Sequence, residues 1–292
     1  MIDLASGKMR TMNTPSLALC IVAIALLSGC GGGGSSPSPA PAASTPTLSK
    51  PWPMGTGTDR VITQDYGAFR LLYDCTERTA LRYEYPLGVD TGTLLRPSKF
   101  TTDDVLPLDC AQQFSTGTYA SVVASWDRGH MVSSNHMDND QVALDRANFM
   151  TNVVPQLASL NRGIWLEAEN VAECYRDVAP LTVYGGVVYD DPANDFFLVS
   201  HGIRSPDWFW KAIVTTDPTT FAPKAIAWLI PNQEGLGPLD SYLVSLDELD
   251  AHVGAAMVNI PGVPAEVRAA KPATTWPLPA NCSLASAAPV PF

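Results

Sequence analysis

The stretch from residue 119 to residue 176 constrains the fold of this chain more than any other part of its sequence. Its pattern predicts a strand, a polar loop and a second strand over about Tyr119–Val154, followed by a helix over about Arg162–Arg176. The first half contains Asp-Arg-Gly-His at residues 127–130, which sets a cation, a glycine and an imidazole side by side. Because an imidazole titrates near neutral pH, His130 has the chemistry of a general base.

The second half of the stretch supplies oxygen atoms of the kind that bind a hard metal ion. Asn161 carries an amide oxygen, a ligand that suits Mg²⁺, and Glu167, Glu169 and Glu173 follow it. Asn161 and Glu169 are eight residues apart, so on one helix they share nearly the same face. A base, a hard-metal ligand and a carboxylate together favour hydrolysis of a phosphate ester. Asn is also a preferred N-cap residue, so a capping role at the start of the helix is the alternative for Asn161.

The segments around this stretch predict a mixed α+β domain. Strands are expected over residues 70–88, 118–126, Leu181–Tyr189, Phe196–Val199, Phe209–Thr215 and Ala225–Leu229. A further helix is expected over Asp240–Met257, and the Pro/Ala-rich tail after Pro261 is expected to be largely irregular. We therefore expect a central, mostly antiparallel sheet flanked by helices.

Composition excludes several classes of protein. Of the 292 residues, 46% are hydrophobic and 16% are charged, which excludes global disorder and a coiled coil. The 18 basic and 29 acidic residues give a formal net charge of −11, which excludes a strongly basic nucleic-acid binder at the level of bulk charge. Residues 121–180 hold four arginines against eight acidic residues. A polyanionic substrate would therefore be held by local contacts rather than by long-range attraction.

The N-terminal region has the features of an export signal. Lys8 and Arg10 precede a short apolar run over Leu17–Leu27, and the run ends in Leu-Ser-Gly-Cys, which resembles a bacterial lipobox. We expect residues 1–30 to be a lipoprotein-type signal peptide, with Cys30 lipidated as the first mature residue; an ordinary signal peptide cut nearby is the alternative. Residues 31–58 are rich in Gly, Ser, Pro and Ala and predict a flexible tether. We expect an exported bacterial protein, membrane-tethered through this anchor and facing the periplasm or the cell surface, or secreted.

The cysteines of the expected folded domain, residues 59–285, suggest two disulfides. An even number of cysteines in an exported chain predicts a disulfide framework, and these four allow three pairings. We favour Cys75–Cys110, which closes a modest loop, and Cys174–Cys282, which ties the C-terminal tail to the body of the domain. A zinc site is the other interpretation, but the chain has no Cys-x-x-Cys pair among these four residues.

Three motifs of this sequence resemble those of a known family in their residues, their order and their spacing. They are DRGHM at residues 127–131, FMTNVVPQ at 149–156 and LNRGIWLEAE at 160–169. They are similar to the sugar-non-specific DNA/RNA endonucleases of the ββα-metal, or His-Me finger, fold. Further similar segments are residues 94–100, 206–211, 225–232 and 241–249.

The resemblance implies a Mg²⁺-dependent hydrolysis of DNA and RNA phosphodiester bonds that leaves 5′-phosphate ends, with Mn²⁺ as an alternative metal. It implies that His130 is the general base and that Asn161 is the sole direct protein ligand of the metal. Glu169 matches the acidic residue that orients the water shell of the metal. Arg96 and Arg128 match arginines that hold the phosphate and stabilise the transition state.

The chain departs from the family pattern at two positions. The family usually has an arginine four residues after the metal-site glutamate, and here that residue is Glu173. Arg176 lies about one turn further on, and we expect it to take over the phosphate contact. His136 occupies a polar stretch and is expected to be a solvated loop histidine. Trp165 is expected to pack in the core, and His201 and His252 have no surrounding constellation that suggests a role.

Two other functions stay open at this point. The first is a catalytically degenerate lipoprotein that binds nucleic acid or another surface, and the lost arginine at position 173 is its support. The second is a phosphoesterase that uses the same metal site on a smaller substrate.

Overall fold

The computed structural model describes residues 60–282 and residue 284, which all belong to one compact unit of the chain. The expected signal peptide at residues 1–30, the lipidation site Cys30 and the tether at 31–58 lie outside the described residues. Among the helices that are described, none has the length and apolar character needed to cross a membrane.

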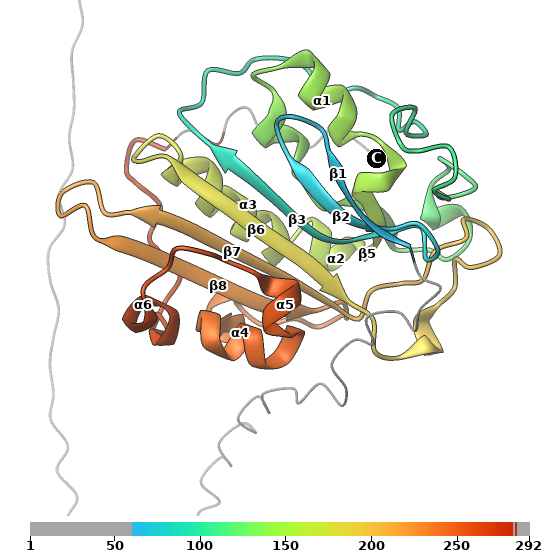
Figure 1. Ribbon diagram of the computed structural model, residues 1–292. Helices are drawn as coiled ribbons and strands as arrows, with labels where there is room; N and C mark the ends of the chain where they lie inside the picture. The colour runs from blue at the N-terminus through green and yellow to red at the C-terminus, as the bar shows by residue number, and fades with distance from the viewer. Residues whose placement is uncertain (1–59, 283, 285–292) are drawn as a thin grey trace, which may run out of the picture. The chain divides into compact units, whose positions relative to one another are not determined.

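A seven-stranded sheet in which every neighbouring pair is antiparallel forms the centre of the domain (Figure 1). Its order is β1-β2-β3-β6-β7-β8-β9. The strands are β1 Val61–Asp65, β2 Arg70–Asp74, β3 Thr79–Leu87, β6 Leu181–Val188, β7 Trp208–Thr216, β8 Pro223–Pro231 and β9 Leu243–Val244. The expected α+β class with a central antiparallel sheet is confirmed.

Helices cover both faces of this sheet. Successive side chains of a strand point to opposite faces, and β3 shows the result. Tyr85 hydrogen-bonds to His136 on the face that also carries α3 (Ile164–Tyr175), whereas the guanidinium of Arg82 donates to the carbonyl of Val258 at the end of α5 (Ala255–Val258). The helices α4 (Leu246–Val253) and α6 (Ala265–Ala269) contact β8. The core therefore lies on both sides of the sheet.

A separate two-stranded hairpin carries the motif residues. β4 (Trp126–His130) pairs antiparallel with β5 (Val153–Leu157), and α2 (Ala158–Asn161) and α3 follow directly. The connection between the two strands contains α1 (Gln141–Ala147) and two short 3₁₀ turns. The buried side-chain amide of Gln113 donates to the carbonyls of Met150 and Val153 and so holds the start of β5.

The hairpin begins and ends differently from the sequence-based prediction. The expected strand over 118–126 is wrong: Tyr119–Ser121 form a 3₁₀ turn, and Ser125 has a left-handed backbone with φ of 68°, so the strand begins only at Trp126. The helix expected over Arg162–Arg176 is α3, which begins at Ile164, and Asn161 belongs to the separate short helix α2 because the chain breaks at Gly163. A side chain at Gly163 would lie 2.4 Å from the carbonyl oxygen of Ser159, and this close approach requires glycine.

Two other predicted elements also differ. The expected strand at Phe196–Val199 is a turn, closed by hydrogen bonds from the amides of His201 and Gly202 to the carbonyl of Phe197. The helix expected over Asp240–Met257 is interrupted by β9, which pairs with the edge of β8, and Gly254 at φ 100° separates α4 from α5. The described part of the tail after Pro261 is largely irregular, as expected, and contains the short helix α6.

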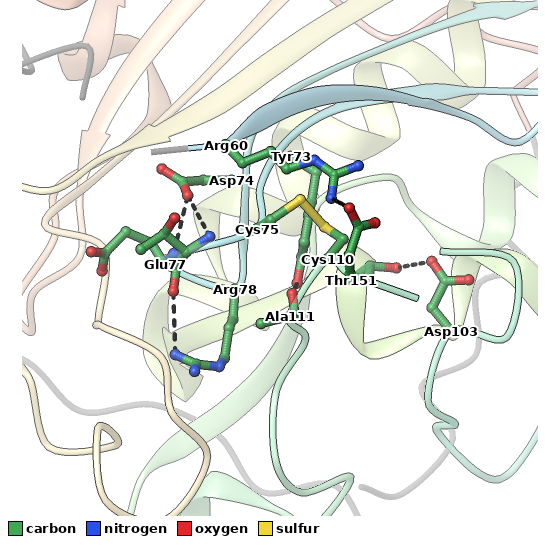
Figure 2. Close-up of a disulfide and its surroundings, with 12 residues drawn as sticks. Arg60, Tyr73, Asp74, Cys75, Glu77, Arg78, Asp103, Cys110, Ala111 and Thr151 are labelled. Atoms are coloured by element: carbon green, nitrogen blue, oxygen red, sulfur yellow. Dashed lines mark hydrogen bonds and ion pairs between the residues drawn. A yellow bond between two sulfur atoms is a disulfide. The ribbon is translucent and has the colours of Figure 1, made fainter. Parts of the chain in front are cut away.

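Two disulfides staple the domain, and both favoured pairings are confirmed. Cys75–Cys110 joins the end of β2 to the long loop before the hairpin, beside the ion pair of Arg60 with Asp109 (Figure 2). Cys174–Cys282 joins α3 to the C-terminal segment and closes 108 residues of sequence. The pairing leaves no role for these four cysteines in a zinc site.

Candidate active site

His130 ends β4 with its imidazole buried and its orientation set by two neighbours. Its Nε2 lies 3.3 Å from Oδ1 of Asn148 and 3.0 Å from Oγ of Ser134. The amide nitrogen of Asn148 donates to the carbonyl of Leu144 at 2.9 Å, so Oδ1 is the atom that faces the imidazole. Because that oxygen only accepts, Nε2 carries the hydrogen and Nδ1 keeps its lone pair. The imidazole is therefore held in the tautomer in which Nδ1 is the base.

The surroundings of His130 favour its unprotonated form. Burial lowers the pKa of His130 well below its ordinary value, and the positive charges of Arg96 and Arg128 lower it further. The hydrogen bond to Asn148 acts in the opposite direction. The imidazole is consequently neutral at pH 7, as a general base must be before it accepts a proton.

Two arginines lie next to this imidazole. Nη2 of Arg96 is 3.5 Å from Nδ1 of His130. Arg128, two residues before His130 on β4, donates from Nη1 to the carbonyl of Thr116 at 2.8 Å. Burial lowers the pKa of both guanidinium groups, and the negative charge of Glu169 acts against this effect at Arg96. Both side chains are partly exposed, so they can meet an anion at the position of the base.

Asn161 is held by a carboxylate on the hairpin. Its Nδ2 donates to Oδ2 of Asp127 at 2.9 Å, and Arg162 makes two hydrogen bonds to the same carboxylate at 2.8 Å and 2.6 Å. Asn161 is the last residue of α2, and the residue that caps α3 is Gly163. The alternative role of Asn161 as an N-cap is therefore wrong. Because Nδ2 of Asn161 donates to Asp127, the other amide atom, Oδ1, is the one that can bind a ligand.

Glu169 on α3 has a cationic partner that sequence reasoning missed. Nζ of Lys211 on β7 lies 3.4 Å from Oε1 of Glu169 and 4.1 Å from the centre of the Trp165 ring. Lys211 is fully buried, and burial lowers its pKa while Glu169 raises it. Trp165 packs in the core as expected, with 1% of its surface exposed. Lys211 is the last residue of the family-like segment 206–211, but nothing in that segment indicated Glu169 as its partner.

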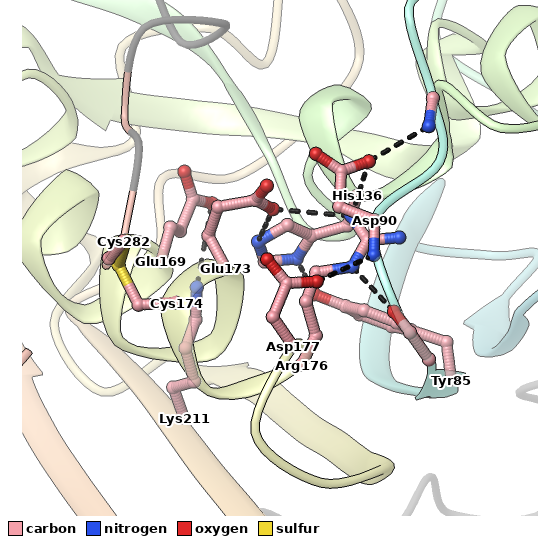
Figure 3. A network of polar contacts seen from close by, with 12 residues as sticks. Tyr85, Asp90, His136, Glu169, Glu173, Cys174, Arg176, Asp177, Lys211 and Cys282 are labelled. Carbon is pink, nitrogen blue, oxygen red and sulfur yellow. Dashed lines mark hydrogen bonds and ion pairs between the residues drawn. A yellow bond between two sulfur atoms is a disulfide. The ribbon is translucent and has the colours of Figure 1, made fainter. Parts of the chain in front are cut away.

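The predicted phosphate contact of Arg176 is wrong. Arg176 is 1% exposed, and its guanidinium donates to the carbonyl of Gly88 at 2.7 Å and lies 3.3 Å from Glu173 and 3.7 Å from Asp90 (Figure 3). Glu173 is itself buried, and burial raises its pKa to about 7. Position 173 therefore faces the interior in this chain, and neither residue can reach a phosphate.

The interpretation of His136 as a solvated loop histidine is also wrong. His136 is 3% exposed, with Nδ1 at 2.7 Å from the hydroxyl of Tyr85 and Nε2 at 3.6 Å from the carboxylate of Glu173 (Figure 3). Burial lowers its pKa, and Lys211 and Arg176 lower it further. A short 3₁₀ turn at Ser134–Met137 carries it inward against β3.

The oxygen donors present here suit a divalent metal. Oδ1 of Asn161 and the carboxylate of Glu169, of which 15% is exposed, are hard ligands of the kind that Mg²⁺ prefers. Within residues 60–282 and 284, no group of three or more His, Cys, Asp or Glu is placed to hold a metal.

A two-stranded hairpin with an imidazole on its first strand, followed by helices that carry an amide and a carboxylate, defines a ββα-metal nuclease fold. Residues 53–264 match the DNA/RNA non-specific endonucleases, and the chain belongs to this family. Family members depend on a divalent metal, generally Mg²⁺.

Two individual proteins illustrate the likeness. The chain is 25% identical over 183 residues to the mitochondrial nuclease of Saccharomyces cerevisiae, which corresponds to 56% of this chain and 54% of the yeast protein. It thus spans about half the length of that relative. The structure is also similar to a chain from the crystal structure of the EndoG/EndoGI complex, with a TM-score of 0.54 and 19% identity over 66% of this chain and 83% of that one. At this identity, the second likeness shows the fold.

Proposed function

We propose that this protein is a Mg²⁺-dependent endonuclease that hydrolyses phosphodiester bonds of DNA and RNA and leaves 5′-phosphate ends. The observation that carries the proposal is the state of His130: a buried, neutral imidazole whose Nε2 is held by Asn148 and whose Nδ1 lies beside Arg96. Membership of the endonuclease family and the oxygen donors of Asn161 and Glu169 support it further.

The proposal gives each side chain a task, which its position supports. Nδ1 of His130 takes a proton from the water that attacks phosphorus, and Asn148 stabilises the imidazolium that forms because its Oδ1 accepts from Nε2. Arg96 and Arg128 bind the non-bridging phosphate oxygens and stabilise the charge that develops on them. Asn161 would hold the divalent metal through Oδ1, and that ion would supply Lewis-acid stabilisation of the leaving 3′ oxygen. The ion pair with Lys211 holds the carboxylate of Glu169 in place.

The acidic composition is compatible with this activity because the contacts are few and local. Most of the affinity of a protein for duplex DNA comes from charge neutralisation by cations, and this chain has a formal charge of −11. Arg96 and Arg128 sit at the base, whereas Arg176 is buried in the interior. We therefore expect weak binding and turnover that depends on two arginines and the metal.

Export is a second part of the proposal. The signal-like residues 1–30, the lipobox-like sequence ending at Cys30 and the tether at 31–58 support a lipid-anchored protein outside the cytoplasm. Two disulfides in one domain support an oxidising compartment, since such bonds are rare in reducing ones. Recovery of the mature protein with its first residue at Cys30 and a bound acyl chain, by mass spectrometry, tests this part.

A cleavage assay tests the activity. Purified protein is incubated with plasmid DNA and with RNA, in Mg²⁺ or in EDTA, and the product ends are tested for ligation without prior phosphorylation. We expect cleavage of both substrates in Mg²⁺, none in EDTA, and ligatable 5′-phosphate ends. Absence of cleavage in Mg²⁺ and in Mn²⁺, with the protein folded, would mean that the proposed activity is wrong.

A further inference from the structure

Phe100 lies at the point where the loop before the hairpin meets the catalytic strand. The next residue, Thr101, makes a bridge with Phe149: its amide donates to the carbonyl of Asn148 at 3.2 Å, and its carbonyl accepts from the amide of Met150 at 2.9 Å. The same Asn148 holds the imidazole of His130 through its side chain. The backbone therefore sets the position of the Phe100 ring relative to the proposed base.

Three basic groups surround this one ring. The guanidinium carbon of Arg128 lies 4.2 Å from the ring centre and that of Arg96 lies 5.7 Å from it. The imidazole of His130 is 5.1 Å away, with its plane tilted by 38°. The face of an aromatic ring carries negative electrostatic potential, so it attracts cations within about 6 Å. Phe100 is thus the common contact of the side chains proposed to bind phosphate and to accept the proton.

The contact with Phe100 offsets the repulsion between Arg96 and Arg128 in the site without substrate. Arg96 and Arg128 carry like charges close together: burial lowers the pKa of Arg96, Glu169 raises it, and Arg128 lowers it. Without a phosphate between them, two like charges in a partly buried site tend to separate. An aromatic face attracts both guanidinium groups and places no competing anion where the phosphate binds.

We propose that Phe100 is a positioning residue, which holds Arg96, Arg128 and the imidazole of His130 in the arrangement that receives the phosphate. The inference rests on the proposed function, because the roles of these three residues do. It implies that an aromatic ring is required at position 100, whereas an aliphatic side chain of similar volume is not sufficient. Phe100 takes no part in the bond changes themselves.

The test compares variants at this position with a matched core variant. Phe100→Leu keeps an apolar side chain but removes the aromatic face, Phe100→Tyr keeps the face, and Phe100→Met provides a second aliphatic variant in case Phe100→Leu fails to fold. Phe69→Leu is the control, because Phe69 is 1% exposed and packs on Tyr66. Thermal melting establishes that each protein is folded before its activity is measured.

We expect kcat/KM on a DNA duplex to fall about tenfold or more in the aliphatic variants, to stay within about threefold of wild type in Phe100→Tyr, and to be unchanged in Phe69→Leu. The histidine protons of His130, followed by NMR through a pH titration, provide a readout that does not need activity. Removing the ring opens the site to water, so the pKa of His130 should rise toward its ordinary value in Phe100→Leu and Phe100→Met only.

The outcomes separate this inference from the proposed function. If wild type cleaves and Phe100→Leu matches it in kcat/KM and in the titration of His130, the inference is overturned while the nuclease stands. Equal losses in Phe100→Leu and Phe100→Tyr also overturn it, because the aromatic face would then not matter. If wild type does not cleave, the proposed function fails, and an unchanged His130 titration in Phe100→Leu overturns the inference independently.

Discussion

Substitutions of Asn148 test the proposed base most sharply. Two substitutions at this position should shift the pKa of His130, and with it the acid limb of kcat/KM, in opposite directions. The hydrogen bond from Nε2 to Oδ1 of Asn148 raises the pKa of His130 against the effect of burial. Asn148→Ala removes this acceptor, so the pKa of His130 should fall and the acid limb of kcat/KM should move to lower pH. Asn148→Asp replaces it with a charged acceptor, so the pKa should rise and the acid limb should move to higher pH.

The magnitudes follow from the strength of the bond. A net hydrogen bond of about 1 kcal/mol corresponds to roughly fivefold, so the plateau of kcat/KM in Asn148→Ala should fall about fivefold as the imidazole loses its orientation. A charge-assisted bond of about 1.5–3 kcal/mol stabilises the protonated base by roughly 10- to 100-fold in Asn148→Asp, which should move the acid limb to higher pH by about one to two units. The assay is the initial rate on a fluorescent duplex from pH 5 to pH 9 at saturating Mg²⁺. Acid limbs that move in the same direction in both variants would refute the assignment of Nδ1 as the base.

Three further substitutions or conditions test the surrounding site. Lys211→Met should raise the Mg²⁺ concentration for half-maximal activity about tenfold, because Glu169 loses its cation; an unchanged Mg²⁺ curve would contradict this role. Glu173→Arg should lower the free energy of unfolding in urea by about 3 kcal/mol or more, because it buries a second cation beside Arg176; wild-type stability would show that position 173 reaches solvent. The salt dependence of DNA binding, measured with His130→Ala and Ca²⁺ in place of Mg²⁺, should give a slope of log K against log salt near about −2 for contacts by Arg96 and Arg128. A slope of about −5 or steeper would mean that a basic groove forms.

Local motifs were sufficient to predict the hairpin chemistry. Two motifs have short internal spacings: the four residues at 127–130 and Asn-x-Gly-x-Trp at 161–165. The residues of each motif therefore lie on one strand or on adjacent helices, close together in the structure. Long β-rich runs such as β6 and β7 were also predictable, since strands buried on both faces are almost continuously apolar. The pairing of Cys174 with Cys282 followed from the need to attach a tail without a core of its own.

Residues whose role depends on distant partners could not be predicted in this way. His136 stands in a polar sequence, and only its packing against Tyr85, 51 residues earlier, shows that it is buried. Arg176 lies about one helical turn after Glu173, so both side chains lie on the same face of α3. That this face points into the interior depends on how α3 packs in the fold. Phe100 and Lys211 lie in the family-like segments 94–100 and 206–211, but their contacts with Arg128 and Glu169 arise only in the tertiary structure. The spacing within each segment does not indicate these partners.

The central claim is that a neutral His130 is the base of a metal-dependent phosphodiester hydrolysis. The most direct measurement compares wild type with His130→Ala on the same duplex in Mg²⁺ across pH 5 to pH 9, with circular dichroism to confirm that both are folded. We expect a loss of about 100-fold or more in kcat/KM, together with loss of the acid limb that belongs to the imidazole. Near wild-type rates in His130→Ala at neutral pH would contradict the account.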